Sequence, residues 1–177
     1  PESRLLEIPG VDGLIGQVWT GTAGTGVYYQ GELKSRYFEY AFLEYGQLVS
    51  MARPHDAKLW FLADPVEDNS ALTWEHYQRA YEQVLVASLL WPQVDHFEVM
   101  PWPERVFAGK HLTEGGGDAM VAIPPDYASE LLAVANALAE MPGAPAALDA
   151  GTGRIGMAVS DTMMFQRSEP HHSDFGM

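Results

Sequence analysis

The chain has 177 residues, of which 47% are hydrophobic and 19% are charged, a composition that favours one folded domain with a buried core. Its 24 acidic and 10 basic residues give a net charge of -14. This balance argues against nucleic acid and anionic membranes as partners, because phosphate groups attract clustered Lys and Arg. The sequence contains no cysteine, which excludes disulfides, thiolate metal ligands and a cysteine nucleophile.

The ends and the apolar stretches of the chain bear on its location. No apolar stretch approaches the roughly 20 residues of a membrane span, and the N-terminus lacks the basic and apolar regions of a signal peptide. We therefore expect no membrane partner and favour a cytoplasmic location. Because the chain starts at Pro1 without a methionine, we also expect a processed protein, a trimmed chain or an internal piece of a longer one.

Four short apolar runs, each ending in a polar or aromatic group, set the expected fold. They are GLIGQVWT at 13–20, KLWFLADPVEDN at 58–69, HFEVMPWPE at 96–104 and RIGMAVSD at 154–161. The first three are followed by segments with helical periodicity, an order typical of parallel α/β proteins, in which ligands bind at the carboxyl ends of the strands. We therefore predict parallel βα units in a single domain spanning residues 1–177.

Apolar residues at helical spacing predict three helices, over 36–53, over 74–91, and from Pro124 and Pro125 to Met141. Thr73 is a candidate N-cap for the second helix. Between them, two passages at 20–31 and 107–123 read as flexible loops, the latter with three consecutive glycines. The C-terminal residues 168–177 have no periodicity, and we expect a flexible tail.

Nucleotide and metal motifs are weak in this chain. Gly151, Gly153 and Gly156 spell GxGxxG, but only 21 residues follow Gly156, too few for the rest of a dinucleotide fold. We favour a glycine-rich turn there. The histidines are scattered, without a paired helical motif, so we predict neither a cofactor nor a metal.

Carboxylates at the predicted strand ends are the stronger signal. Glu98 lies inside the apolar third run, where a buried charge needs a partner or a polar cavity, so it is either catalytic or ion-paired with an Arg such as Arg105 or Arg167. Asp64 closes the second run and is the candidate for the second catalytic carboxylate. Asp68 follows it, and Asp161 ends the fourth run; both are either ligands or ordinary loop residues.

Two tryptophans accompany these carboxylates. Trp19, beside Gln17, and Trp102, beside Pro101, follow the first and third runs. A flat indole suits the apolar face of a sugar ring, and carboxylates and amides bind its hydroxyls, although core packing would also place Trp here. We therefore predict that Gln17, Trp19, Asp68, Trp102 and Asp161 bind a saccharide. Paired carboxylates beside aromatic rings are what glycoside hydrolysis requires.

Several strings, among them GQVWTGTA, LWFLADPVEDN, HFEVMPWPERVF and VSDTMMFQR, resemble a family of large, poorly characterised bacterial proteins related to glycoside hydrolases and, more distantly, to β-galactosidases. The resemblance covers about residues 13–167. It implies a (β/α)8 barrel of the TIM type. A full barrel takes about 250 residues, so this chain would supply part of one.

These observations together predict a glycosidase within a partial TIM-type barrel, with Glu98 and Asp64 as the catalytic carboxylates. The alternative fold is an open doubly wound α/β sheet. The alternative function is a noncatalytic domain that binds saccharide or another protein, since fold alone does not fix function. Unpaired strand edges on a partial barrel also predict a homo-oligomer.

Overall fold

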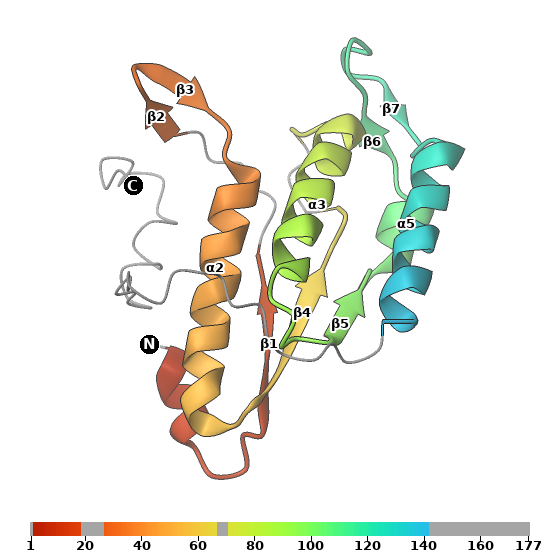
Figure 1. The fold of residues 1–177 in the computed structure, drawn as a ribbon. Helices are drawn as coiled ribbons and strands as arrows, with labels where there is room; N and C mark the ends of the chain where they lie inside the picture. The colour runs from red at the N-terminus through yellow and green to blue at the C-terminus, as the bar shows by residue number, and fades with distance from the viewer. Residues whose placement is uncertain (1, 19–26, 67–70, 142–177) are drawn as a thin grey trace.

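The structure is a computed structural model that describes residues 2–18, 27–66 and 71–141. It is a mixed α/β structure with a parallel three-stranded sheet and, among these residues, four α-helices (Figure 1). The elements of the sheet and its connections are β1 (Gly13–Gln17), α2 (Tyr37–Ala52), β4 (Lys58–Ala63), α3 (Trp74–Leu89) and β5 (His96–Val99). The other elements are η1 (Glu2–Glu7), β2 (Val27–Tyr29), β3 (Glu32–Lys34), η2 (Arg53–His55), α4 (Pro103–Phe107), β6 (His111–Leu112), β7 (Met120–Val121) and α5 (Pro125–Ala139).

The three parallel strands lie in chain order, β1-β4-β5. Helix α2 connects β1 to β4, and α3 connects β4 to β5; the two helices pack side by side (Figure 1). Right-handed crossovers between adjacent parallel strands place both helices on one face of the sheet. Three strands in chain order occur both in a barrel and in one half of a doubly wound sheet.

The residues of one register row show which face of the sheet meets the helices. Gly16, Phe61 and Phe97 share this row. Phe61 is fully buried, and its ring lies 4.2 Å from that of Tyr45 on α2. A Cβ on Gly16 would lie 2.3 Å from the Leu48 Cδ1 of α2, so a larger residue here would displace the end of the Leu48 side chain. Since side chains alternate along a strand, the neighbouring row points away from the helices.

Helix α3 contributes to both hydrophobic clusters of the described chain. The first cluster joins α2 to the sheet and consists of Val18, Tyr37, Ala41, Tyr45, Val49, Phe61, Ala80, Val84, Ala87 and Val94. The second joins α3 to α5 and consists of Ala63, Val66, Tyr77, Tyr81, Leu85, Val106, Ile123, Tyr127, Leu131 and Leu138. Ala80, Val84 and Ala87 face the first cluster, whereas Tyr77, Tyr81 and Leu85 face the second. Both hydrophobic clusters therefore pack against this helix.

All three predicted helices are confirmed, as α2, α3 and α5, and the N-cap of α3 is confirmed because the Thr73 hydroxyl accepts a hydrogen bond of 3.2 Å from the His76 N–H. The two predicted flexible loops are wrong in part. Residues 27–29 of the first form β2, which pairs with β3 directly after the passage, and residues of the second form the hairpin β6–β7. Strands of two or three residues are too short to show an alternating pattern.

Residues 142–177 lie outside the described residues, and with them the fourth apolar run, the GxGxxG string and the predicted tail. In the part of the chain that is described, no helix has the length and apolar character needed to cross a bilayer.

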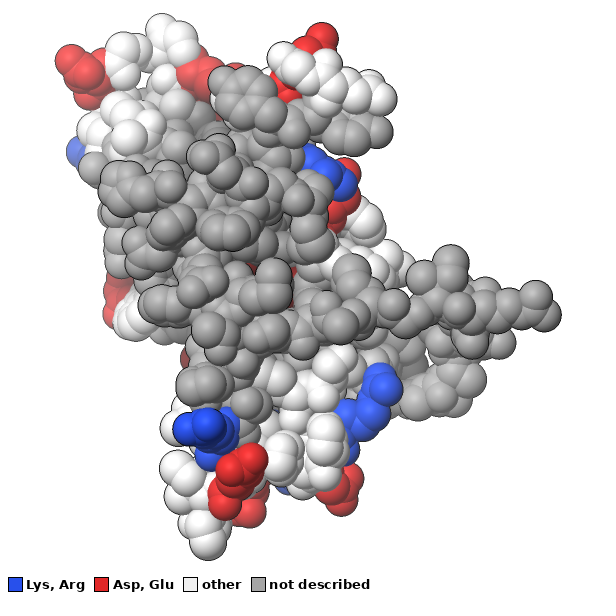
Figure 2. All heavy atoms as spheres, turned by 90° about the vertical axis from the view of Figure 1, so that its left-hand side faces the viewer, with Lys and Arg blue, Asp and Glu red and all other residues white. Residues whose placement is uncertain are grey.

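On the face shown in Figure 2, the Lys and Arg of the described residues are few and form no continuous patch. Two ion pairs join residues close together in the sequence: Lys34 pairs with Glu32 at 3.5 Å, and Arg36 pairs with Glu39 at 3.4 Å.

Candidate functional site

The sheet face away from the helices carries two of the predicted site residues in one row. Gln17, Leu62 and Glu98 are in register across β1, β4 and β5, at or next to the carboxyl end of each strand. The preceding row on the same face consists of Ile15, Trp60 and His96. Glu98 is half-buried, and no described residue forms an ion pair or a hydrogen bond with its carboxylate. It lies near the end of the sheet at which ligands of parallel α/β proteins bind.

Asp64, the other predicted catalytic carboxylate, is committed to a buried ion pair. It directly follows β4, and its carboxylate pairs with the Arg105 guanidinium of α4. Its side chain is only 3% exposed, and it also accepts a hydrogen bond of 3.3 Å from the Val66 N–H. The sequence suggested Arg105 as a partner for Glu98, but Arg105 pairs with Asp64 instead. Because 41 residues separate the two, nothing local in the sequence indicated the pair.

Trp102 adjoins this ion pair and is exposed. The Arg105 guanidinium carbon lies 5.0 Å from the centre of the Trp102 ring, within cation–π range. The indole is 59% exposed, and Trp102 is the N-cap residue of α4, directly beyond β5. Between β5 and α4, Met100 adopts a left-handed φ of 51°, and its N–H donates to the Ala63 carbonyl at 3.3 Å. This turn redirects the chain from the strand into α4.

The remaining predicted ligands, Trp19, Asp68 and Asp161, lie outside the described residues, as does Arg167. The site therefore rests on residues from β1, β4, β5 and α4. Gln17 and Glu98 share one row, whereas Asp64, Arg105 and Trp102 form a second group just beyond the strand ends. Within the described ranges, no group of three or more His, Asp or Glu side chains is arranged to bind a metal ion.

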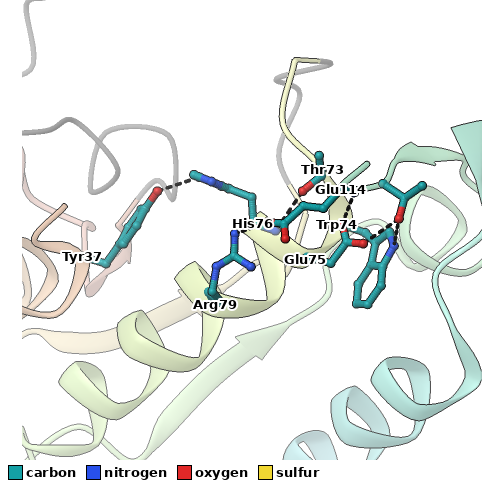
Figure 3. A network of polar contacts seen from close by, with 8 residues as sticks. Tyr37, Thr73, Trp74, Glu75, His76, Arg79 and Glu114 are labelled. Carbon is teal, nitrogen blue, oxygen red and sulfur yellow. Dashed lines mark hydrogen bonds and ion pairs between the residues drawn. The ribbon is translucent and has the colours of Figure 1, made fainter. Parts of the chain in front are cut away.

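A network of polar contacts at the N-terminus of α3 involves residues that the sequence analysis did not single out (Figure 3). The Thr113 hydroxyl, just after β6, donates to Glu75 at 2.6 Å and accepts from the Trp74 indole N–H at 3.2 Å. The Glu114 N–H donates to Glu75 at 3.1 Å, and the Glu114 carboxylate pairs with Arg79 at 2.5 Å. Glu75 and Arg79 thus fasten the start of the β6–β7 loop to α3.

The same network reaches α2 through a tyrosine–histidine pair. The Tyr37 hydroxyl and His76 Nε2 are 2.6 Å apart, and their rings meet edge to face (Figure 3). Burial, with the positive charge of Arg79, lowers the pKa of His76 below its usual value, against an opposite effect of Glu114. A neutral His76 with its proton on Nδ1 accepts a hydrogen bond at Nε2 from the Tyr37 hydroxyl, and burial raises the pKa of that hydroxyl.

This pair predicts a loss of stability in mild acid. The unfolded histidine titrates near pH 6.5 and the folded one lower, so the unfolded chain binds more protons between the two values. The free energy of unfolding should therefore be highest above about pH 6.5 and fall as the pH drops below it. Urea unfolding between pH 7.5 and 5 measures this dependence.

His76→Gln keeps an acceptor for the Tyr37 hydroxyl but cannot be protonated in this range. Its stability should depend less steeply on pH than that of the wild type. Some dependence remains, because burial also lowers the pKa of His111. An equally steep curve in His76→Gln would contradict the assignment to His76.

A hollow of about 380 Å³ lies at the other end of the sheet, where the amino ends of the strands meet. Its lining includes Arg53, Lys58, Gln93, Val94 and His96, from the amino ends of β4 and β5 and the segments before them. None of the predicted site residues lines it. Ligands of parallel sheets bind at the carboxyl ends of the strands, so this position disfavours the hollow as the substrate site.

No protein-family model matches the chain, and the searches of curated proteins and of solved structures found no match either.

Proposed function

We propose that this chain is part of a (β/α)8-type barrel and acts on saccharides at the carboxyl ends of its strands, as a glycoside hydrolase. The observation that carries the proposal is the row of Gln17, Leu62 and Glu98 on the sheet face away from the helices. In a barrel this face is the interior, and residues near the carboxyl ends line the active site. The resemblance to glycoside-hydrolase-related proteins supports the same function.

The composition of that face supports a barrel over a doubly wound sheet. A doubly wound sheet is covered by helices on both faces, and its strands are apolar on both. Here Gln17, His96 and Glu98 interrupt the apolar residues of the face opposite α2 and α3. Ile15, on the same face, is 55% exposed. Polar side chains beside apolar ones suit a barrel interior that holds a hydroxyl-rich ligand.

Within this proposal Glu98 is the reacting carboxyl group. Glycoside hydrolysis uses one carboxyl group to protonate the leaving oxygen and another to attack the anomeric carbon or activate water. Glu98 lies near the carboxyl end of β5, and its carboxylate forms no ion pair with any described residue. Asp64, by contrast, is buried against Arg105, an environment that suits a residue that positions its neighbours. Gln17 is placed to bind a sugar hydroxyl from the other side of the row.

The engagement of Asp64 also favours a second candidate function, noncatalytic saccharide binding. If Asp64 is not available for chemistry, the described residues offer one carboxylate at the site where hydrolysis needs two. The two functions differ in a simple measurement. A panel of nitrophenyl glycosides should be hydrolysed by the wild type under the first proposal. Under the second, saccharides bind without release of nitrophenol.

A partial barrel also predicts self-association. In the described part of the sheet, β1 and β5 each pair with β4 alone, so the outer edge of each has no partner strand there. Such edges accept strands from another chain. We expect a dimer or larger assembly with no cofactor, which light scattering over a range of protein concentrations would detect. A monomer at the highest concentration would contradict this expectation.

A further inference from the structure

We propose that the exposed face of Trp102 stacks against a neutral pyranose ring, and that Arg105, held by Asp64, positions the indole and disfavours cationic ligands. The proposal rests on the saccharide ligand of the proposed function but not on hydrolysis. It assigns Asp64 and Arg105 to positioning and Trp102 to contact with the ligand.

Exposure distinguishes Trp102 from the other described tryptophans. Trp60, Trp74 and Trp91 are half-buried; Trp91 stacks on Phe42 at 4.9 Å, and Trp74 donates a hydrogen bond to Thr113. Trp102 is 59% exposed at the end of the sheet where ligands of parallel α/β proteins bind. One face of its ring meets the Arg105 guanidinium at 5.0 Å, so a ligand would stack on the other.

The guanidinium beneath the indole is fixed by contacts that do not involve the ligand. The Arg105 side chain is 23% exposed and pairs with Asp64, which is 3% exposed. The backbone N–H of Arg105 also donates to the backbone carbonyl of Trp102 at 3.0 Å, and this hydrogen bond closes the first turn of α4. A planar guanidinium that pairs with a carboxylate can present its face to a ring at the same time, which the ammonium group of lysine cannot do. The guanidinium therefore contacts one face of the indole before a ligand arrives.

The charge under the ring limits which ligands can stack on it. An exposed indole in a protein of net charge -14 would otherwise attract cations. The positive charge of Arg105, partly offset by its partner Asp64, opposes a second cation on the other face of the same ring, while the net negative charge of the protein disfavours anionic sugars. The C–H face of a neutral pyranose carries neither penalty. Neutral sugars should therefore bind more tightly than protonated amino sugars.

The test measures binding by calorimetry at pH 6 to a panel of neutral oligosaccharides of glucose, galactose, mannose, xylose and N-acetylglucosamine, with glucosamine oligosaccharides as the cationic counterpart. At least one neutral member should bind more tightly than the glucosamine series. Trp102→Ala should weaken that binding by about tenfold, the amount expected for loss of one aromatic stacking contact. Phe107→Ala, which removes a 39% exposed ring from the same helix, is the matched control and should leave binding unchanged.

Arg105→Lys tests the positioning role. It keeps the positive charge beside Asp64 but loses the planar contact with the indole, so binding should weaken several-fold while circular dichroism remains native. If that variant fails to fold, Trp102→Ala and Trp102→Phe still decide the question, because an exposed ring is not part of the core. Trp102→Phe should retain part of the affinity.

Three results would overturn the inference: no binding to any member of the panel, full affinity in Trp102→Ala, or glucosamine oligosaccharides binding as tightly as neutral ones. These results are separable from failure of the hydrolase proposal. Binding that depends on Trp102, without any hydrolysis, would support the inference and sink the hydrolase. Hydrolysis that is indifferent to Trp102 would do the reverse.

Discussion

Replacing Glu98 by Gln should lower the rate of glycoside hydrolysis by at least about a hundredfold, the lower end of what a positioned acid or base contributes. The substitution keeps the size of the side chain and its place in the row with Gln17 and Leu62. It removes the ability to donate or accept the proton or to form a covalent intermediate. Affinity for the sugar should change little, so the loss should appear in kcat rather than KM.

Glu140→Gln is the matched control for this experiment. Glu140 is exposed and caps the C-terminus of α5, away from the row that contains Glu98, and its loss removes the same charge. Its activity should equal that of the wild type. Thermal unfolding of both variants shows whether either change acts through stability. Full activity in Glu98→Gln would rule out Glu98 as the reacting group.

Arg105→Met should destabilise the fold by about 3 kcal/mol, the lower end of the range for breaking a buried ion pair. The variant leaves the Asp64 carboxylate, 3% exposed, without its cationic partner. The value lies at the lower end because Arg105 is 23% exposed, and solvent then reduces the charge interaction. Urea unfolding at pH 7.5 measures the change.

The double variant Asp64→Leu with Arg105→Met distinguishes two contributions to that loss of stability. One is the ion pair itself, and the other is the cost of burying the Asp64 carboxylate without Arg105. Replacing both partners by apolar side chains is often close to neutral, so the double variant should regain most of the stability that Arg105→Met loses. If the double variant is as unstable as the single one, the packing of the arginine stem, rather than the unpaired charge, explains the loss. A cost below about 1 kcal/mol in Arg105→Met would place the pair among weak surface bridges.

Periodicity and capping predicted the elements whose signals are local. The helical spacing of apolar residues identified α2, α3 and α5, and Thr73 marked the start of α3. The apolar runs also identified β1, β4 and β5 and their parallel arrangement. The hairpins β2–β3 and β6–β7 escaped, because their strands have two or three residues and lie among glycines.

The positions of the candidate residues at the strand ends were predictable, but their interaction partners were not. Glu98 and Gln17 were expected at the strand ends, and the register joins them in one row. The partners of Asp64 and His76 were not evident, since each contact joins residues about 40 positions apart whose meeting depends on how α4 and α2 pack. Asp64 looked like Glu98 in sequence, as a carboxylate at the end of an apolar run. Only the position of Arg105 distinguishes the two.

The packing of both hydrophobic clusters against α3 has a consequence for how this chain unfolds. Ala80 and Val84 pack into one core, and Tyr77 and Tyr81 pack into the other, from the same two turns of helix, about eight residues. Neither core can open by releasing α3 without exposing the other, so the two should melt in a single cooperative step. The amide hydrogens of α3 should exchange with solvent only through global unfolding, whereas the short hairpins should exchange through local opening.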